Sequence, residues 1–398
     1  SLGCIEGAEK IKEAYEDGVD SIIVPSRGAC PIVRGVIKAI EEYAAHKGGD
    51  YETIYNALQI PPFMKNGYKG GEEKDKKYES KDKNLRKIAV IPYPLTADVS
   101  LSEDLLREYG TNLDYVTDSI RNYGAEVIAS FTQHPEERAN NNKFNFLTFV
   151  FEDVEGRKEE ADFYRNIEQI NYFLVFDTVV SGRSLSTIVK NLENLKVKYR
   201  AIGVVDVNGA KLKLEYRKIL NSSGKVELIE VDRILSEDRG ASLLGVVGCI
   251  YPNLALEAKE DLDIRPCGAV TWHHIPYNSR NKISQEMKES FNLHNQVFKD
   301  YIGAIYDGIE LLVREKPEKD TESRMKEKIE RVARSIEEHR LLNHGREFLD
   351  PYAFVKDNIK VEDIYESSSH VIHILFPPDE IKKLLKVYRE KYRKINKK

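Results

Sequence analysis

The chain has 398 residues, of which 41% are hydrophobic and 32% are charged, so it can bury a sizeable core and is not disordered as a whole. Its 61 Lys and Arg residues nearly balance its 66 Asp and Glu residues, and the net charge of -5 argues against a general nucleic-acid binder. No apolar run approaches the ~20 residues of a membrane helix, and no secretory signal pattern is present. The four cysteines form no Cys-x-x-Cys pair, which predicts neither a zinc site nor a disulfide framework. We therefore expect a soluble, cytoplasmic protein.

The first part of the chain predicts helices that alternate with short apolar strands. A helical pattern over residues 5–17 precedes a strand at 21–24, and a second helix starts near Pro31, a residue favoured at the first helical position. Apart from Ser21 the strand is apolar, which is typical of a parallel sheet covered on both faces. Residues 65–87 are mostly charged or glycine and indicate a surface excursion.

The middle of the chain continues this alternation, which favours an α/β fold with a parallel sheet flanked by helices. We expect further strands at 88–91, 125–131, 144–152, 172–176 and 201–207. We expect helices near 101–109, 113–122 and 184–195. Residues 210–232 predict a hairpin or meander appended to the sheet.

The last part of the chain is predicted to be mainly helical. Its pattern gives helices over 283–314, 321–343 and 379–395, and a strand candidate at 370–376. We therefore divide the chain into an α/β domain over residues 1–278, with insertions near 65–87 and 130–165, and a mainly helical C-terminal region over 279–398.

The most informative segment is an apolar strand that ends in Asp177 and is followed by a short polar loop and a helix. The loop reads Ser181-Gly182-Arg183-Ser184. Its glycine permits a tight turn, the N–H groups of the loop and helix can face an anion, and the helix dipole favours negative charge there. Both serines add hydroxyl donors, and Ser184 also suits an N-cap. Ligands of open α/β sheets bind outside the carboxyl ends of the strands, where this loop would lie. A capped turn without a ligand is the alternative.

At these residues the chain resembles the type I phosphoribosyltransferases, whose signature is an apolar strand, two acids, two apolar residues and a Thr-Gly-x-Thr/Ser loop. The resemblance implies that loop 181–184 holds the 5′-phosphate of phosphoribosyl pyrophosphate. It also implies that Asp177 engages the ribose hydroxyls and Mg²⁺. The chain departs from the signature at Phe176, which replaces the first acid, and at Val180, which precedes the loop.

A second segment, from Val24 to Pro31, resembles the pyrophosphate loop of the same family, especially that of purine-salvage members. The resemblance implies that the pyrophosphate is held by Ser26, Arg27, Gly28 and Ala29. Arg27 would pair with the pyrophosphate oxygens, and Gly28 would allow close approach of the backbone. An ordinary turn is the alternative for this segment alone. The resemblance covers mainly residues 1–45 and 170–207.

Three functions are consistent with these patterns. The first is magnesium-dependent transfer of a phosphoribosyl group to a base, with a purine favoured and pyrophosphate released. The second is a sensor that binds a phosphorylated ribose or nucleotide with weakened chemistry, and whose C-terminal helices contact a protein partner or a second copy. The third is a scaffold that binds neither ligand.

Other candidates are less specific. A mobile catalytic loop could lie at 65–87 or at 130–142, although a solvated insertion is favoured for the first. Trp272 or Tyr251 could stack on a base, with core packing favoured for Trp272. His370 and His373 have an odd spacing and would not share a strand face, which argues against a metal pair.

Overall fold

The computed structural model describes residues 1–25, 29–61, 85–93, 95, 114–145, 148, 158–179, 181–206, 212–231 and 300–342. Predictions for 101–109, 370–376 and 379–395, and for most of 65–87, lie outside these residues. Within the described part of the chain, no helix combines the length and the apolar character needed to cross a bilayer.

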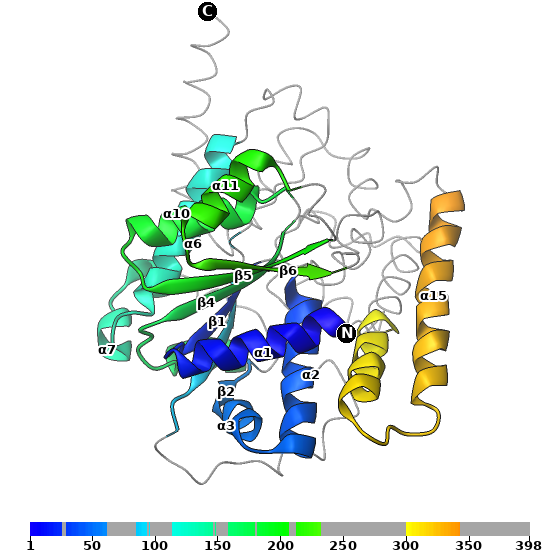
Figure 1. Ribbon diagram of the computed structural model, residues 1–398. Coiled ribbons are helices and arrows are strands. Elements are labelled where there is room, and N and C mark those ends of the chain that lie inside the picture. The colour runs from blue at the N-terminus through cyan, green and yellow to red at the C-terminus, as the bar shows by residue number, and fades with distance from the viewer. Residues whose placement is uncertain are drawn as a thin grey trace, which may run out of the picture.

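Six parallel strands form one sheet in the order β2-β3-β1-β4-β5-β6 (Figure 1). The strands are β1 (Ser21–Val24), β2 (Leu58–Gln59), β3 (Ile88–Pro92), β4 (Phe173–Thr178), β5 (Tyr199–Asp206) and β6 (Val226–Val231). The residues of β1 and β3 are buried throughout, as expected for strands that are covered on both faces. The α/β class predicted from the sequence is therefore confirmed.

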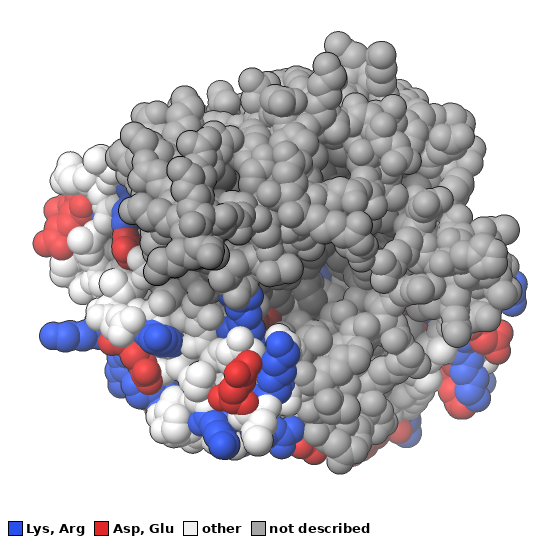
Figure 2. All heavy atoms as spheres, turned by 90° about the horizontal axis from the view of Figure 1, so that it is seen from above, with Lys and Arg blue, Asp and Glu red and all other residues white. Residues whose placement is uncertain are grey.

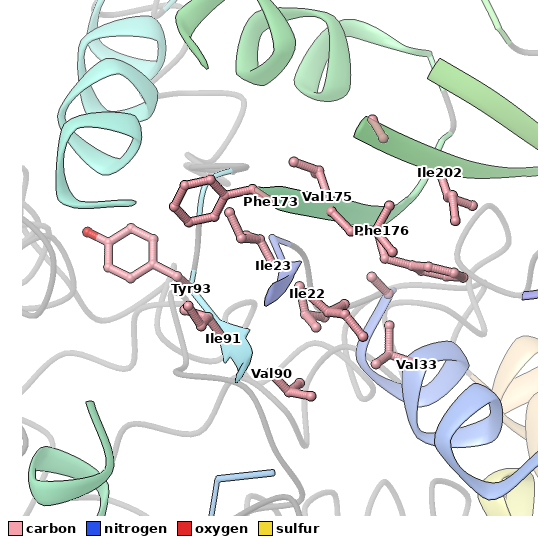
Figure 3. Packing of buried hydrophobic residues seen from close by; sticks show 14 of the residues in the cluster. Ile22, Ile23, Val33, Val90, Ile91, Tyr93, Phe173, Val175, Phe176 and Ile202 are labelled. Atoms are coloured by element: carbon pink, nitrogen blue, oxygen red, sulfur yellow. The ribbon is translucent and has the colours of Figure 1, made fainter. Parts of the chain in front are cut away.

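Helices cover both faces of this sheet (Figure 1). One face carries α1 (Leu2–Glu16), α2 (Ala29–Lys47) and α3 (Asp50–Ala57). The opposite face carries α6 (Asp114–Ser130), α10 (Arg183–Asn194) and α11 (Leu214–Ser222). The short helices α7 (Pro135–Arg138) and α9 (Lys158–Arg165) lie between α6 and β4 in the chain. Side chains of β1, β3 and β4 fill the space between the layers, with Val33 of α2 beside them (Figure 3).

The predicted strand at 125–131 is wrong, because α6 continues to Ser130. Its buried side chains include Ala125 and Ile128, whose spacing fits one face of a helix, and the apolar run is too short to separate the two periods by pattern alone. Residues 142–145 are also helical, so the described start of the predicted strand 144–152 is wrong as well.

The predicted hairpin at 210–232 is replaced by a helix and a sixth strand. After α11 the chain enters β6, which pairs with β5 in parallel, from Ala201↔Val226 to Asp206↔Val231. A parallel neighbour requires a crossover, and α11 supplies it. The helical pattern of α11 is weak because Leu214 and Ile219 are exposed while Leu220 is buried.

Two helices of the C-terminal part are described, one over residues 300–313 and α15 (Thr321–Leu342). The first packs on α1 and α2, since Ile305 and Ile309 join the hydrophobic core of the sheet. Ser1 Oγ donates a hydrogen bond of 3.2 Å to the carbonyl oxygen of Ile305. The side chain of Asp300 pairs with Arg331 and thereby joins this helix to α15.

Charged side chains of both signs are interspersed over the described surface that Figure 2 shows. This pattern follows from the composition, in which 61 basic residues are nearly balanced by 66 acidic ones. On the described part of that face, no wide area carries one sign of charge.

Candidate functional site

The two loops singled out by the sequence follow neighbouring strands. β1 and β4 pair in parallel, with Ile23 opposite Val175, so their carboxyl ends lie side by side. α2 follows β1 on one face of the sheet, whereas α10 follows β4 on the other face (Figure 1). The chain therefore diverges between these two strand ends, which is the topological switch point where open α/β sheets bind ligands. Ser26, Arg27 and Gly28 lie outside the described residues.

The exit of β1 is fixed from its other side by the segment after β3. Tyr93 N donates to Val24 O at 3.1 Å, and Leu95 N donates to Pro25 O at 3.1 Å. α2 begins at Ala29, two residues before the expected start at Pro31, and Ala29 is fully buried. The N-terminus of α2 thus follows the upstream loop directly, in an orientation that favours an anion.

Gly182 has a left-handed conformation, with φ +84° and ψ −5°. A Cβ at this position would lie 3.0 Å from Tyr216 Cβ and would collide with the side chain of Leu212. Backbone conformation and packing therefore both require glycine here. Leu212 lies just before α11 and Tyr216 lies within it, so this helix packs against the turn from outside. The predicted hairpin did not anticipate this role.

α10 begins at Arg183, with Gly182 as its N-cap, so the prediction that Ser184 is the N-cap is wrong. Arg183 N donates to Ser181 Oγ at 3.4 Å, and the helical ladder starts with Ser186 N, which donates to Gly182 O at 3.0 Å. The N–H groups in between belong to the first turn of a helix and have no intrahelical acceptor. They suit a bound anion.

The hydroxyls of Ser181 and Ser184 are both used as acceptors by the protein. Ser181 Oγ accepts from Arg183 N, and Ser184 Oγ accepts from Arg121 Nη2 at 3.1 Å. For neither hydroxyl proton does the described structure contain an acceptor. Each proton can therefore be donated to a ligand, as the sequence predicts for a phosphate loop.

Arg121 is a site residue that the sequence analysis missed. It lies on α6, and only 3% of its surface is exposed. A signal was present, because an arginine at this position shares the helical face of Ala125 and Ile128, which is apolar and buried. A cation on a buried face usually has a specific anionic or polar partner.

Asp177 faces the layer that contains α10. It lies opposite Gly203 of β5, where a Cβ would meet Val179 at 2.8 Å and Leu185 of α10 at 3.2 Å. The Asp177 side chain is buried, and its Oδ1 accepts a hydrogen bond of 2.8 Å from Thr178 N. The single acid of the signature therefore lies on the same side of the sheet as the loop that follows it.

Phe176 points to the other face. It is fully buried, and a Cβ added to Gly7 of α1 would lie 3.3 Å from Phe176 Cζ (Figure 3 shows its ring in the core). Successive residues of a strand alternate between faces. An acid at position 176 would consequently point into the core between the sheet and α1, away from Asp177.

Asp177 offers a carboxylate to a magnesium ion. Nowhere among the described residues do three His, Cys, Asp or Glu side chains gather as a metal site would require. Mg²⁺ is commonly held by one or two carboxylates together with substrate phosphates. Asp177 therefore fits an ion that arrives with a diphosphate, and it does not by itself form a metal site.

Residues 130–142 do not border this site. Ile170 N donates to Phe131 O at 2.9 Å, and Gln169 Nε2 donates to Thr132 O at 2.8 Å, just before β4 begins. The stretch thus lies at the amino ends of the strands, where Arg138 is buried and donates to the carbonyl oxygen of Arg165. The remaining candidates lie outside the described residues: Tyr251, Trp272, His370 and His373.

Comparisons of the chain with protein-family models, curated proteins and solved structures found no match.

Proposed function

We propose that the chain has a type I phosphoribosyltransferase-like fold and binds the 5′-phosphate of phosphoribosyl pyrophosphate or of a nucleotide at loop 181–184. The observation that carries the proposal is that the loops after β1 and β4 leave adjacent strand ends at the switch point of the sheet. Two independent sequence segments that resemble phosphate-binding loops are thereby brought to one edge.

The residues of this edge have distinct roles in the proposal. Loop 181–184 donates backbone N–H groups and two hydroxyl protons to the 5′-phosphate. Asp177 accepts hydrogen bonds from the ribose hydroxyls. Arg27, in the upstream loop, pairs with the pyrophosphate, and the N-terminus of α2 adds to the positive potential there.

The first candidate activity is transfer of the phosphoribosyl group to a base, with a purine favoured. A ring nitrogen of the base forms a bond to C1′ of the ribose while the bond from C1′ to the pyrophosphate oxygen breaks. Both electrons of the broken bond leave with pyrophosphate, and the ring N–H proton of the base is released to solvent. Mg²⁺, when bound, would neutralise the charge on that leaving group. The chain itself would fix both phosphates and the ribose in line for this displacement.

The second candidate is a sensor, and Phe176 favours it. Because this side chain belongs to the core between β4 and α1, position 176 does not supply the first acid of the signature to the site. A reduced ribose contact supports binding more readily than turnover. The helix over 300–313 packs on α2, which begins at the upstream loop, so α2 connects this helix to the ligand edge.

Calorimetric titration with phosphoribosyl pyrophosphate and Mg²⁺ tests the binding site. We expect saturable binding to the wild type, and at least about tenfold weaker binding when Ser181→Ala and Ser184→Ala are combined, because two hydrogen bonds to a charged group are lost. The matched control combines Ser222→Ala and Ser223→Ala, whose hydroxyls donate to backbone carbonyls at the end of α11. Absence of binding to the wild type would refute the proposed function.

Pyrophosphate release in the presence of individual purine and pyrimidine bases separates the two candidates. Release that depends on one base supports the transferase. Tight binding without release by any base supports the sensor.

A further inference from the structure

We infer that Arg121 is a positioning residue for the phosphate loop: it holds the Ser184 hydroxyl in the orientation that donates to a bound phosphate, and it places a fixed positive charge behind the loop. This inference rests on the proposed function. It assigns a role to a residue of α6, which packs against α10.

The direction of the hydrogen bond between these residues is fixed by their chemistry. Arg121 Nη2 lies 3.1 Å from Ser184 Oγ, and a guanidinium has only donors. The serine oxygen must therefore accept. Its own proton is then directed away from Arg121, and the described structure provides no acceptor for it.

Other hydroxyls of α10 donate their protons to the protein backbone. Ser186 Oγ donates to Arg183 O at 2.9 Å, and Thr187 Oγ1 donates to the same carbonyl oxygen at 3.0 Å. Such bonds to the preceding turn are the usual arrangement of hydroxyls in a helix. Ser184, in contrast, accepts from a buried cation, and its proton is kept for a ligand.

The charge of Arg121 also bears on which form of the phosphate binds. With 3% of its surface exposed, the guanidinium is shielded from solvent ions, and it stays protonated at every pH of interest. A phosphate monoester gains its second negative charge near pH 6. A fixed cation behind the loop would therefore favour the dianion, and affinity should rise as the pH passes through this range.

The test is titration of ribose 5-phosphate into the wild type, Arg121→Met, Ser184→Ala and the double variant, at pH 5.5 and at pH 7.5. We expect each single variant to bind about tenfold more weakly at pH 7.5, and the double variant to be little weaker than Arg121→Met, because both changes remove the same hydrogen bond. We also expect Arg121→Met to lose most of the gain in affinity that the wild type shows between the two pH values. Lys190→Met, an exposed cation on α10, is the control and should bind as the wild type does.

Thermal unfolding of every variant shows whether the fold is kept. If Arg121→Met does not fold, Arg121→Lys carries the test, because it keeps the charge and loses the planar donor group, so the pH response should persist while the affinity falls. Additive losses in the double variant, or an unchanged pH response in Arg121→Met, would overturn the role of Arg121 alone. A wild type that does not bind ribose 5-phosphate would overturn the proposed function together with this role.

Discussion

Gly182 and Gly224 both have positive φ, +84° and +63°, but their surroundings differ. A Cβ at Gly182 would collide with Leu212, whereas a Cβ at Gly224 would meet no atom within 4 Å. We expect Gly224→Ala to cost about 1 kcal/mol through backbone strain. We expect Gly182→Ala to cost about 2 kcal/mol more, because α11 must also move away from the loop.

Urea unfolding measures the free energy of unfolding of both variants, and calorimetry with phosphoribosyl pyrophosphate measures how each substitution affects binding. Only Gly182→Ala should weaken binding, since Gly224 lies between α11 and β6, away from the loop. Equal losses of stability in the two variants would contradict the packing around Gly182.

The burial of Phe176 predicts how substitutions at this position change the stability of the fold. A restored acid would seem to repair the family signature, but the structure directs this side chain into the core beside Gly7. We expect Phe176→Asp to destabilise the fold by about 4 kcal/mol or more, because an aromatic ring is lost and a carboxylate is buried. Phe176→Leu should cost about 1 kcal/mol. Chemical denaturation of both variants checks this, and a stable Phe176→Asp that turns over substrate would contradict it.

Sequence patterns reach some of these residues and not others. The left-handed turn at Gly182 and the acid Asp177 at a strand end were predictable, because each depends on local chain geometry. The pairing of Arg121 with Ser184 was not, since it joins two helices whose packing the one-dimensional pattern does not specify. The N-cap was misassigned because glycine at 182 occupies the position that serine usually fills.

Helix α2 and the helix over 300–313 are joined by a network of charges centred on Glu42. Its carboxylate is nearly buried and accepts two hydrogen bonds from Arg314, of 2.7 and 3.0 Å, while Lys38 Nζ lies 2.9 Å away. His46 Nε2 lies 3.5 Å from the same carboxylate. Burial alone would raise the pKa of Glu42, but hydrogen bonds and charges from Arg314 and Lys38 outweigh it and lower the pKa to about 2.

The lowered pKa of Glu42 makes stability dependent on pH in the acid range. A carboxyl group whose pKa is lower in the folded state stabilises the fold fully above its unfolded value, near 4.5, and loses this contribution as the pH falls towards 2. The difference corresponds to about 3 kcal/mol. Glu42→Gln should therefore destabilise the protein at pH 7 and flatten the decline between pH 5 and pH 2, as measured by unfolding at each pH.

Glu41 provides the matched control for this expectation. It pairs with Lys38 at 2.9 Å but is more exposed than Glu42, and within the described part of the chain its carboxylate does not bond to Arg314. Glu41→Gln should change stability by less than about 1 kcal/mol. If the two variants lose the same stability, the network of charges centred on Glu42 does not stabilise the fold as inferred.

At the level of elements, apolar strands were the most predictable features. The strands expected at 21–24, 88–91, 172–176 and 201–207 all exist: the first has the expected bounds, and the ends of the others differ by at most two residues. Elements with mixed faces were not predictable, as α11 illustrates, because its exposed Leu214 and Ile219 obscure the helical period. The order of the strands depends on contacts distant in sequence, and no local pattern contains that information.

At the scale of the whole molecule, the helix over 300–313 packs against the α/β part of the chain. Ile309 is fully buried in the core on the side of α1 and α2, and Ile305 is nearly so. We expect a fragment of residues 1–278 to melt roughly 5–15 °C below the full chain, because this apolar contact is lost. Differential scanning calorimetry of both proteins provides the measurement.

Two substitutions in the full chain test whether the buried face of this helix causes the difference in stability. Ile309→Ala should lower stability by about 2–5 kcal/mol, whereas Leu312→Ala on the same helix, with 52% of its surface exposed, should change it little. A fragment 1–278 as stable as the full chain would mean that the helix over 300–313 covers the core without stabilising it.

The contact between Ser1 and Ile305 joins residues separated by 304 positions in the chain. During translation at roughly 5–20 residues per second, α1 and α2 leave the ribosome tens of seconds before the helix that covers them is made. Throughout that interval the apolar surface that Ile305 and Ile309 will cover is exposed to the surrounding solution. The order of synthesis thus leaves the outer face of α1 and α2 uncovered by this helix until residues 300–313 have been made.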